Sequence, residues 1–176
     1  MAKSYNTANI EEWADKLVCG EEILLSGVVY TARDAAHKRI KALVDEGKPL
    51  PFELKNATVY YAGPTPEKPG MPIGSCGPTT STRMDVFVPQ FMDLGLKCMI
   101  GKGNRGQAVI DAIVRNKGVY LCAIGGAGAL AARCVKKLDI IAFEDLGCES
   151  VKRLEIENFP LYVGIDSQGR SLFGAK

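Results

Sequence analysis

The stretch KCMIGKGNRGQAVIDAIVRNKGVYLCAI, residues Lys97–Ile124, determines the class of fold that we expect. An apolar run, Lys97–Ile100, leads into a glycine-rich turn, 101–106, and then into a helical pattern that continues to about Asn116. A second apolar run, Val119–Ile124, follows directly. Strand, tight turn, helix and strand are the repeating unit of α/β proteins, so this stretch predicts an α/β fold.

The same alternation extends toward both ends of the chain. Downstream, the pattern predicts a helix from about Gly128 to Lys137, strands at Asp139–Phe143, Val151–Ile156 and Leu161–Asp166, and a hairpin-type turn at 166–169. Upstream, it predicts helices at Asn9–Leu17, from Thr31 to about Asp45 and from Pro89 to Gly95, and strands at Glu22–Tyr30 and Asn56–Ala62. A length of 176 residues suits one domain, residues 1–176.

The helix after the first strand begins with an unusual cation. Thr31 and Asp34 have the spacing of a capping box, which predicts that the helix opens here. Arg33 and His37 are four residues apart and share a face of that helix. A cation in the first turn opposes the helix dipole, so Arg33 favours an anion-binding site. His37 is the single histidine, and the common alternative for it is a hydrogen-bonded structural residue.

A second candidate site is the segment Gly77-Pro78-Thr79-Thr80-Ser81-Thr82-Arg83-Met84-Asp85. Gly-Pro marks a loop, and Thr79 or Thr80 is a natural helix N-cap. Arg83 would then lie one turn further on, where its guanidinium and the free N–H groups of the helix start could bind a carboxylate. From spacing alone the more common alternative is a capped helix whose Arg83 pairs with Asp85 or faces water.

Two strand-to-helix turns are further candidates, because α/β folds bind ligands there. Lys102 and Arg105 lie in the first, beside glycines that permit close approach, although solvated loop charges are the common alternative. In the second, residues 126–131 fit G-x-G-x-x-A, with Glu144 placed 18 residues after Gly126. This pattern resembles a dinucleotide-binding fingerprint, so a dehydrogenase-like domain is an alternative function. The plainer interpretation is close helix–strand packing or a tight turn that faces the site.

Composition excludes several classes of protein. A formal net charge of +2 argues against a general nucleic-acid binder. The apolar run Val119–Ala132 is shorter than the roughly 18 residues of a membrane span, and the first residues lack the apolar core of a signal peptide, so we expect a cytoplasmic chain. The six cysteines show no CxxC pair, which favours free thiols, with Cys98 and Cys122 in the core.

Taken together, the motifs resemble those of the β subunit, or C-terminal domain, of iron–sulfur hydro-lyases, namely class I fumarases and L-tartrate dehydratases. The similar blocks, in the family's order, are ARDAAH at 32–37, GPTTSTRMD at 77–85, IGKG at 100–103, GGAGA at 125–129, NFP at 158–160 and ID at 165–166. They cover roughly Gly20 to Phe173. The resemblance implies the single swivelling β/β/α domain of that family.

The resemblance also implies roles for individual residues. Arg33, Arg83 and Lys102 match residues that bind the carboxylates of a four-carbon dicarboxylate, with fumarate/malate expected first and tartrate second. Thr79 matches the threonine proposed as the base at the carbon next to a carboxylate. The same resemblance implies that His37 assists substrate binding at the site.

A cofactor and a partner follow from the same resemblance. The [4Fe–4S] cluster of such enzymes belongs to a partner α subunit, so we assign no metal ligand to this chain and keep Cys76 as a lining residue at most. The isolated chain is expected to be inactive, and the active form is expected to be a hetero-oligomer with the α subunit. We expect it to bind neither nucleic acid nor membrane. The remaining alternative is a non-catalytic interaction subunit, in which changing Arg33 or Arg83 would leave the activity of the complex unchanged.

Overall fold

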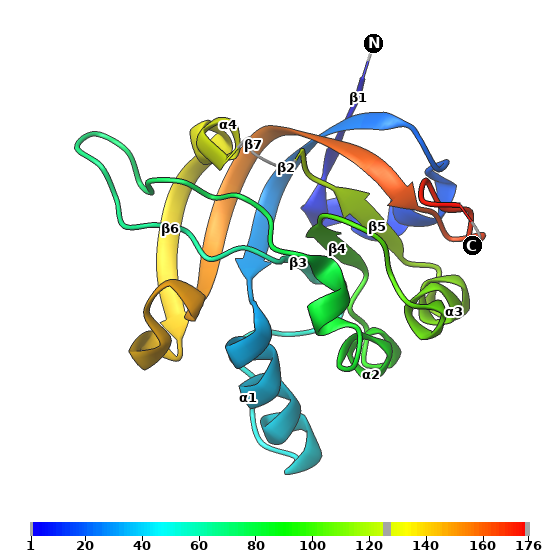
Figure 1. Cartoon of the computed structure of the whole chain (residues 1–176), viewed down its shortest axis with the longest axis horizontal. Coiled ribbons are helices and arrows are strands. Elements are labelled where there is room, and N and C mark those ends of the chain that lie inside the picture. The colour runs from blue at the N-terminus through cyan, green and yellow to red at the C-terminus, as the bar shows by residue number, and fades with distance from the viewer. Residues whose placement is uncertain (1, 125–127, 175–176) are drawn as a thin grey trace.

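A computed structural model describes residues 2–124 and 128–174. Their strands form a seven-stranded sheet in the order β1-β2-β3-β4-β5-β7-β6, and an additional pairing of β2 with β7 closes its middle into a barrel (Figure 1). The strands are β1 (Lys3–Asn6), β2 (Glu22–Thr31), β3 (Thr58–Tyr60), β4 (Cys98–Gly101), β5 (Val119–Cys122), β6 (Val135–Ala142) and β7 (Val151–Ile165). The α-helices are α1 (Asp34–Asp45), α2 (Val88–Asp93), α3 (Gln107–Asn116) and α4 (Gly128–Cys134).

Strands β1 to β5 run parallel, and β7 runs antiparallel to both β2 and β5. Helices α1, α2 and α3 gather on one side of the barrel, while α4 and the long loop before the 77–85 segment lie on the other (Figure 1). This mixed α/β fold agrees with the α/β class that the sequence pattern predicts and with the β/β/α type that the family resemblance implies. None of the helices in the described ranges has the length and apolar character needed to cross a membrane.

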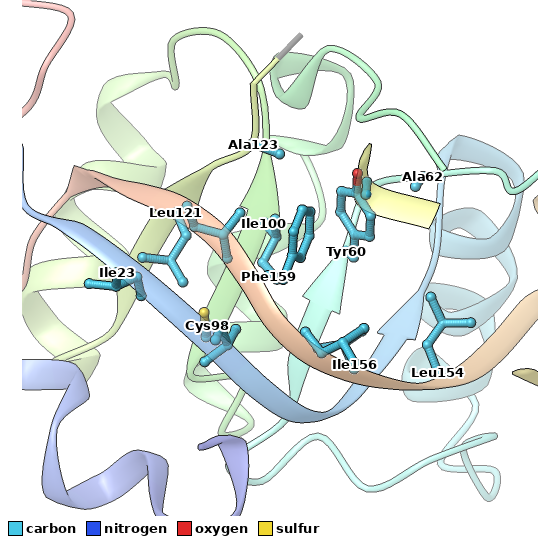
Figure 2. Packing of buried hydrophobic residues seen from close by; sticks show 14 of the residues in the cluster. Ile23, Tyr60, Ala62, Cys98, Ile100, Leu121, Ala123, Leu154, Ile156 and Phe159 are labelled. Carbon is cyan, nitrogen blue, oxygen red and sulfur yellow. The ribbon is translucent and has the colours of Figure 1, made fainter. Parts of the chain in front are cut away.

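Side chains that alternate along the central strands supply two hydrophobic cores. Tyr60, Ile100 and Leu121 point into the barrel, where they meet residues of β2 and β7 such as Phe159 (Figure 2). The intervening residues, among them Tyr61 of the β3 end, face the layer of α1, α2 and α3. Both faces of β3, β4 and β5 are therefore buried, which explains why these strands are short, largely apolar runs in the sequence.

One long strand, β7, replaces the two strands expected at Val151–Ile156 and Leu161–Asp166. Asn158 has a left-handed backbone, with φ of 50°, and the register against β2 shifts opposite it between Leu25 and Gly27. Such an irregularity bends a strand without ending it. The polar and proline residues near position 160 therefore mark a bend, which the sequence pattern cannot distinguish from a break.

Three other local predictions were wrong in detail. The expected helix Asn9–Leu17 is two short 3₁₀ helices, η1 (Thr7–Glu12) and η2 (Ala14–Lys16), which are separated by non-helical angles at Trp13; Asn9 also kinks η1. Thr31 does not cap α1: it ends β2, and its Oγ1 accepts a hydrogen bond of 3.2 Å from the Lys152 backbone. Residue 33 is the N-cap of α1, without a side-chain cap bond. The helix expected to reach Lys137 ends at Cys134, where β6 begins.

The strand after α4 decides against the dinucleotide-binding alternative. That fold needs the next strand to return parallel to β5 in the same sheet, whereas β6 pairs antiparallel with β7. Glu144 lies exposed in the 3₁₀ helix η4 (Glu144–Glu149). Gly126 and Ala127 of the glycine pattern lie outside the described residues.

Candidate functional site

The 77–85 segment runs along the carboxyl ends of the central parallel strands. The Thr79 N–H donates to the Tyr61 carbonyl, just beyond β3, at 2.7 Å. The Ser81 N–H donates to the Lys102 carbonyl, just beyond β4, at 3.0 Å, and Thr80 and Lys102 form a parallel bridge. Because ligands of α/β folds bind at this edge, the segment lies where a site is expected.

The local conformation of this segment differs from the expected capped helix. A single 3₁₀ turn, η3 (Ser81–Met84), follows Thr80, and the Thr80 side chain makes no capping bond. Thr79 is half-buried, whereas Thr80 and Lys102 are exposed. Thr80 occupies the N-cap position, as predicted, but its hydroxyl group does not cap the turn and is available for other contacts.

Each of the two candidate arginines has a carboxylate at its Nε atom. Arg83 Nε lies 2.8 Å from Asp34 Oδ1, with 52% of the Arg83 side chain exposed. Arg33 Nε lies 3.4 Å from Glu149 Oε1. The pairing of Arg83 with Asp85, considered from the sequence, is not formed. The Arg83–Asp34 pair brings η3 against the first turn of α1, so Arg33 and Arg83 belong to the same edge of the sheet as Lys102.

Asp85 holds Arg105 instead. Arg105 Nε donates to Asp85 Oδ1 at 2.8 Å, and the Gly106 N–H donates to the other oxygen of that carboxylate at 2.6 Å. The Arg105 side chain is 0% exposed and lies over the rings of Tyr61 and Tyr120. Arg105 is therefore a buried structural cation that attaches the 101–106 turn to the 77–85 segment, and it does not line the site.

A chain of hydroxyl groups supports the same attachment. Ser81 Oγ and the Tyr120 hydroxyl are 2.9 Å apart, and Tyr120 donates to the Gly103 carbonyl at 2.9 Å. A Cβ atom on Gly101 would lie 2.0 Å from Ser81 Oγ, so only glycine permits this approach. The turn that carries Lys102 is thus fixed relative to Thr79 and Thr80.

His37 is buried beneath the site. Its Nδ1 is 2.9 Å from the Arg33 carbonyl oxygen, and its ring packs against Tyr61, Phe87 and Phe91. Burial lowers the pKa of His37 to about 4, so the ring is neutral at pH 7. The side chain is 1% exposed and does not face the edge where a substrate would bind; its link to the site is the backbone of Arg33.

The model of the fumarase C-terminus matches residues 3–176. The chain belongs to this family. It is 44% identical to fumarate hydratase 1, mitochondrial, of Leishmania major and 42% identical to the anaerobic class I fumarate hydratase of Escherichia coli, each over 85% of this chain and 28% of the relative. It is 38% identical to a putative L(+)-tartrate dehydratase subunit beta of Methanocaldococcus jannaschii, over 90% of this chain and 84% of that one.

The two fumarate hydratases are thus much longer than the segment they share with this fumarase C-terminal chain, which spans 28% of their length. The beta subunit of the putative tartrate dehydratase, by contrast, is matched over most of its length. The family therefore includes both a region of a long chain and a separate subunit.

The cysteines of this family member do not form a metal site among residues 2–124 and 128–174, where no group of three His, Cys, Asp or Glu side chains is placed to hold an ion. All six cysteines are free, as predicted. Cys76 is fully buried in the barrel core, and burial raises its pKa to about 12, so it neither lines the site nor offers a thiolate. Cys98 is buried as expected, and Cys122 is partly buried.

The glycine block after β5 has a packing role at its described end. Gly128 begins α4, and its carbonyl accepts the Cys76 N–H at 3.0 Å. A Cβ atom on Gly128 would lie 2.3 Å from Ser75 Oγ and 3.1 Å from the Gly77 nitrogen. The glycine thus permits α4 to touch the loop before Thr79, so the close packing at this glycine is between helix and loop.

Sequence reasoning missed the two carboxylates that hold the arginines. Asp34 lies within the ARDAAH block, but its spacing to Arg83 gives no local signal, because the pair joins separate elements. Glu149, which lies on η4, is even more distant in sequence from Arg33 than Asp34 is from Arg83. Only the fold brings these four side chains together.

Proposed function

We propose that this chain is the β subunit of an iron–sulfur-dependent hydro-lyase. It would take part in the reversible hydration and dehydration of a four-carbon dicarboxylate, with fumarate/malate favoured and tartrate the second choice. The printed names of its relatives support the reaction class, since they include fumarate hydratases and a putative tartrate dehydratase subunit beta.

The gathering of cations at one edge of the sheet carries the proposal. The Thr80–Lys102 bridge attaches the turn of Lys102 to the segment that carries Thr79 and Arg83, and the Arg83–Asp34 pair attaches the same segment to the start of α1, next to Arg33. A dicarboxylate has two negative groups, which a set of arginine and lysine side chains neutralises and orients. A surface with this arrangement suits a small dianion better than a neutral substrate.

Each side chain has a proposed role in the reaction. Arg33, Arg83 and Lys102 bind and orient the carboxylates, which draws electron density from the carbon that loses its proton. Thr79 transfers the proton at that carbon. Within residues 2–124 and 128–174 the Thr79 hydroxyl makes no hydrogen bond, so it is available to a substrate. His37 supports the site through its contact with the Arg33 carbonyl, which keeps the start of α1 in place.

The cluster itself does not fit this chain, since the described cysteines are dispersed and lack a common ligand geometry. We therefore place the [4Fe–4S] group on an α subunit and propose a hetero-oligomer. The name of the tartrate dehydratase relative, a subunit beta, supports such a partner. Six free cysteines suit a reducing compartment, and the cytoplasm is the proposed location.

The test is anaerobic co-purification with the candidate α subunit, followed by assays of fumarate hydration and tartrate dehydration. We expect the isolated chain to be colourless and inactive and the complex to be active with one of the two substrates. An isolated chain that reconstitutes a [4Fe–4S] spectrum would contradict the subunit assignment. A complex whose activity survives replacement of both Arg33 and Arg83 would favour the non-catalytic alternative.

A further inference from the structure

The contact between Arg33 and Glu149 is unusual among the ion pairs of this protein. Its two atoms, Nε and Oε1, are 3.4 Å apart and buried, and neither has a hydrogen-bond partner within the described residues. A formed hydrogen bond would need about 2.9 Å. Buried polar atoms without partners are costly, so a native pair of this kind calls for an explanation.

The segment that carries Glu149 is held firmly by a buried lysine. Lys152 Nζ donates to the carbonyls of Gly147, Cys148 and Ser150 at 3.0–3.2 Å and to Ser150 Oγ at 2.7 Å. Lys152 is 5% exposed and has no acidic partner among residues 2–124 and 128–174, and burial lowers its pKa. An ammonium group surrounded by carbonyls fixes the end of η4, and with it the backbone of Glu149.

Arg33 is enclosed on the same side. A Cβ atom built on Gly63 would lie 3.1 Å from the Cys148 carbonyl oxygen and 3.3 Å from Arg33 Cδ. Gly63, in the chain after β3, therefore lies against both the arginine stem and the segment that Lys152 anchors. Its Nε edge faces Glu149, and within the described ranges the guanidinium has no other ionic partner.

We propose that Glu149 is a positioning residue for Arg33, held in place by Lys152. The Glu149 carboxylate occupies the Nε side of the guanidinium, so the two Nη groups remain for a substrate carboxylate. Asp34 holds the Nε atom of Arg83 in the same manner, at 2.8 Å. Closing the 3.4 Å gap by about 0.5 Å would complete the Arg33–Glu149 hydrogen bond when a ligand draws the arginine into its bound position. This inference rests on the proposed function, because it gives Arg33 a substrate to bind.

The kinetic test uses the complex with the α subunit, with fumarate as the probe. Glu149→Gln keeps the side-chain shape but removes the charge, and we expect the KM for fumarate to rise about tenfold while kcat changes less than about twofold. Lys152→Met should also raise the KM for fumarate. The KM of the double variant should be only slightly higher than that of the more impaired single variant, because both residues act through Arg33. Asp145→Asn is the matched control: it lies on η4, pairs with exposed Arg39, and should leave both constants unchanged.

A second measurement needs no activity. In the ¹⁵N-labelled chain, the Arg33 Nε–H signal, identified by its loss in Arg33→Lys, should exchange slowly with solvent and should become fast in Glu149→Gln but not in Asp145→Asn. An unchanged KM and unchanged exchange in Glu149→Gln would overturn the positioning role, even if Arg33→Lys impairs activity. A different outcome would be fast Nε–H exchange in Glu149→Gln together with unchanged kinetics in Arg33→Lys. That outcome would support the positioning of Arg33 by Glu149 but contradict the substrate-binding role of Arg33 in the proposed function.

Discussion

Asp85 and Arg105, 20 residues apart in the chain, form a buried ion pair whose Nε–Oδ1 distance is 2.8 Å. Asp85 ends the 77–85 segment, and Arg105 belongs to the turn that carries Lys102. The pair therefore joins the two stretches that supply Thr79 and Lys102, and it fixes how far apart these side chains lie. The stability of the fold and the geometry of the site depend on the same contact.

The first prediction concerns that pair. Asp85→Asn removes the charge opposite a guanidinium that is 0% exposed, which should lower the free energy of unfolding by about 3–5 kcal/mol. Urea unfolding of the isolated chain measures this. Asp93→Asn is the control, because the Arg115–Asp93 pair is half exposed and should contribute at most about 1 kcal/mol. Equal losses in the two variants would show that Asp85 does not compensate a buried charge.

The second prediction concerns pH. The pKa of His37 is about 4 in the folded chain and 6.5 when unperturbed, so between these values the unfolded state binds a proton that the folded state does not. The free energy of unfolding should therefore fall by about 2 kcal/mol from pH 7 to pH 5, through this residue alone. NMR titration of the ring measures the pKa directly. His37→Gln should reduce the pH 7 to pH 5 difference by that amount; an unchanged difference would assign it to other groups.

The third prediction separates the two adjacent threonines in the assembled complex. Thr79→Val removes the proposed proton-transfer oxygen and should lower kcat roughly a hundredfold or more, with little change in the melting temperature. Thr80→Ala should change both activity and stability little, because the Thr80 side chain makes no capping bond. Loss of turnover in Thr80→Ala, with normal turnover in Thr79→Val, would transfer the role to Thr80.

The fourth prediction addresses carboxylate binding. Arg33→Lys and Arg83→Lys keep the positive charge but lose the planar pair of donors, so kcat/KM of the complex should fall by an amount equivalent to about 2–4 kcal/mol for each. Arg39→Lys is a matched control, since Arg39 pairs with Asp145 on the exposed side of α1. Wild-type kcat/KM in both Arg33→Lys and Arg83→Lys would exclude these residues as substrate ligands.

The α/β class, the central strands β2, β4 and β5 and helix α3 could be predicted from the sequence, because their apolar periodicity is local. The bend at Asn158 could not, since a strand that changes direction has the same pattern as two strands. Strand β6 was predicted too short, because its first residues continue the helical composition of α4. Closure of the barrel depends on pairing between β2 and β7, for which the composition of neither strand gives a signal.

The candidate site shows the same division. Arg33, Arg83 and Lys102 were selected from motifs, and the ends of neighbouring strands bring the segments that carry them together. Their partners, Asp34 and Glu149, were not selected, because ion pairs between distant elements follow from the fold. The role of Arg105 could not be predicted, because the sequence pattern of a buried arginine does not differ from that of a solvated one. The packing of Arg105 against Tyr61 and Tyr120 shows that it is buried.

Strand β7 has a consequence for how the chain folds. Thr31 and Lys152, which are hydrogen-bonded neighbours of β2 and β7, are 121 residues apart in the sequence. Bringing such distant segments together carries a large loop-closure entropy before any pairing compensates it, which slows folding. Until β7 arrives, β2 and β5 each expose an unpaired edge to other chains. We therefore expect slow refolding that loses yield to aggregation as the protein concentration rises, and an intermediate in which the parallel strands have formed but the barrel remains open.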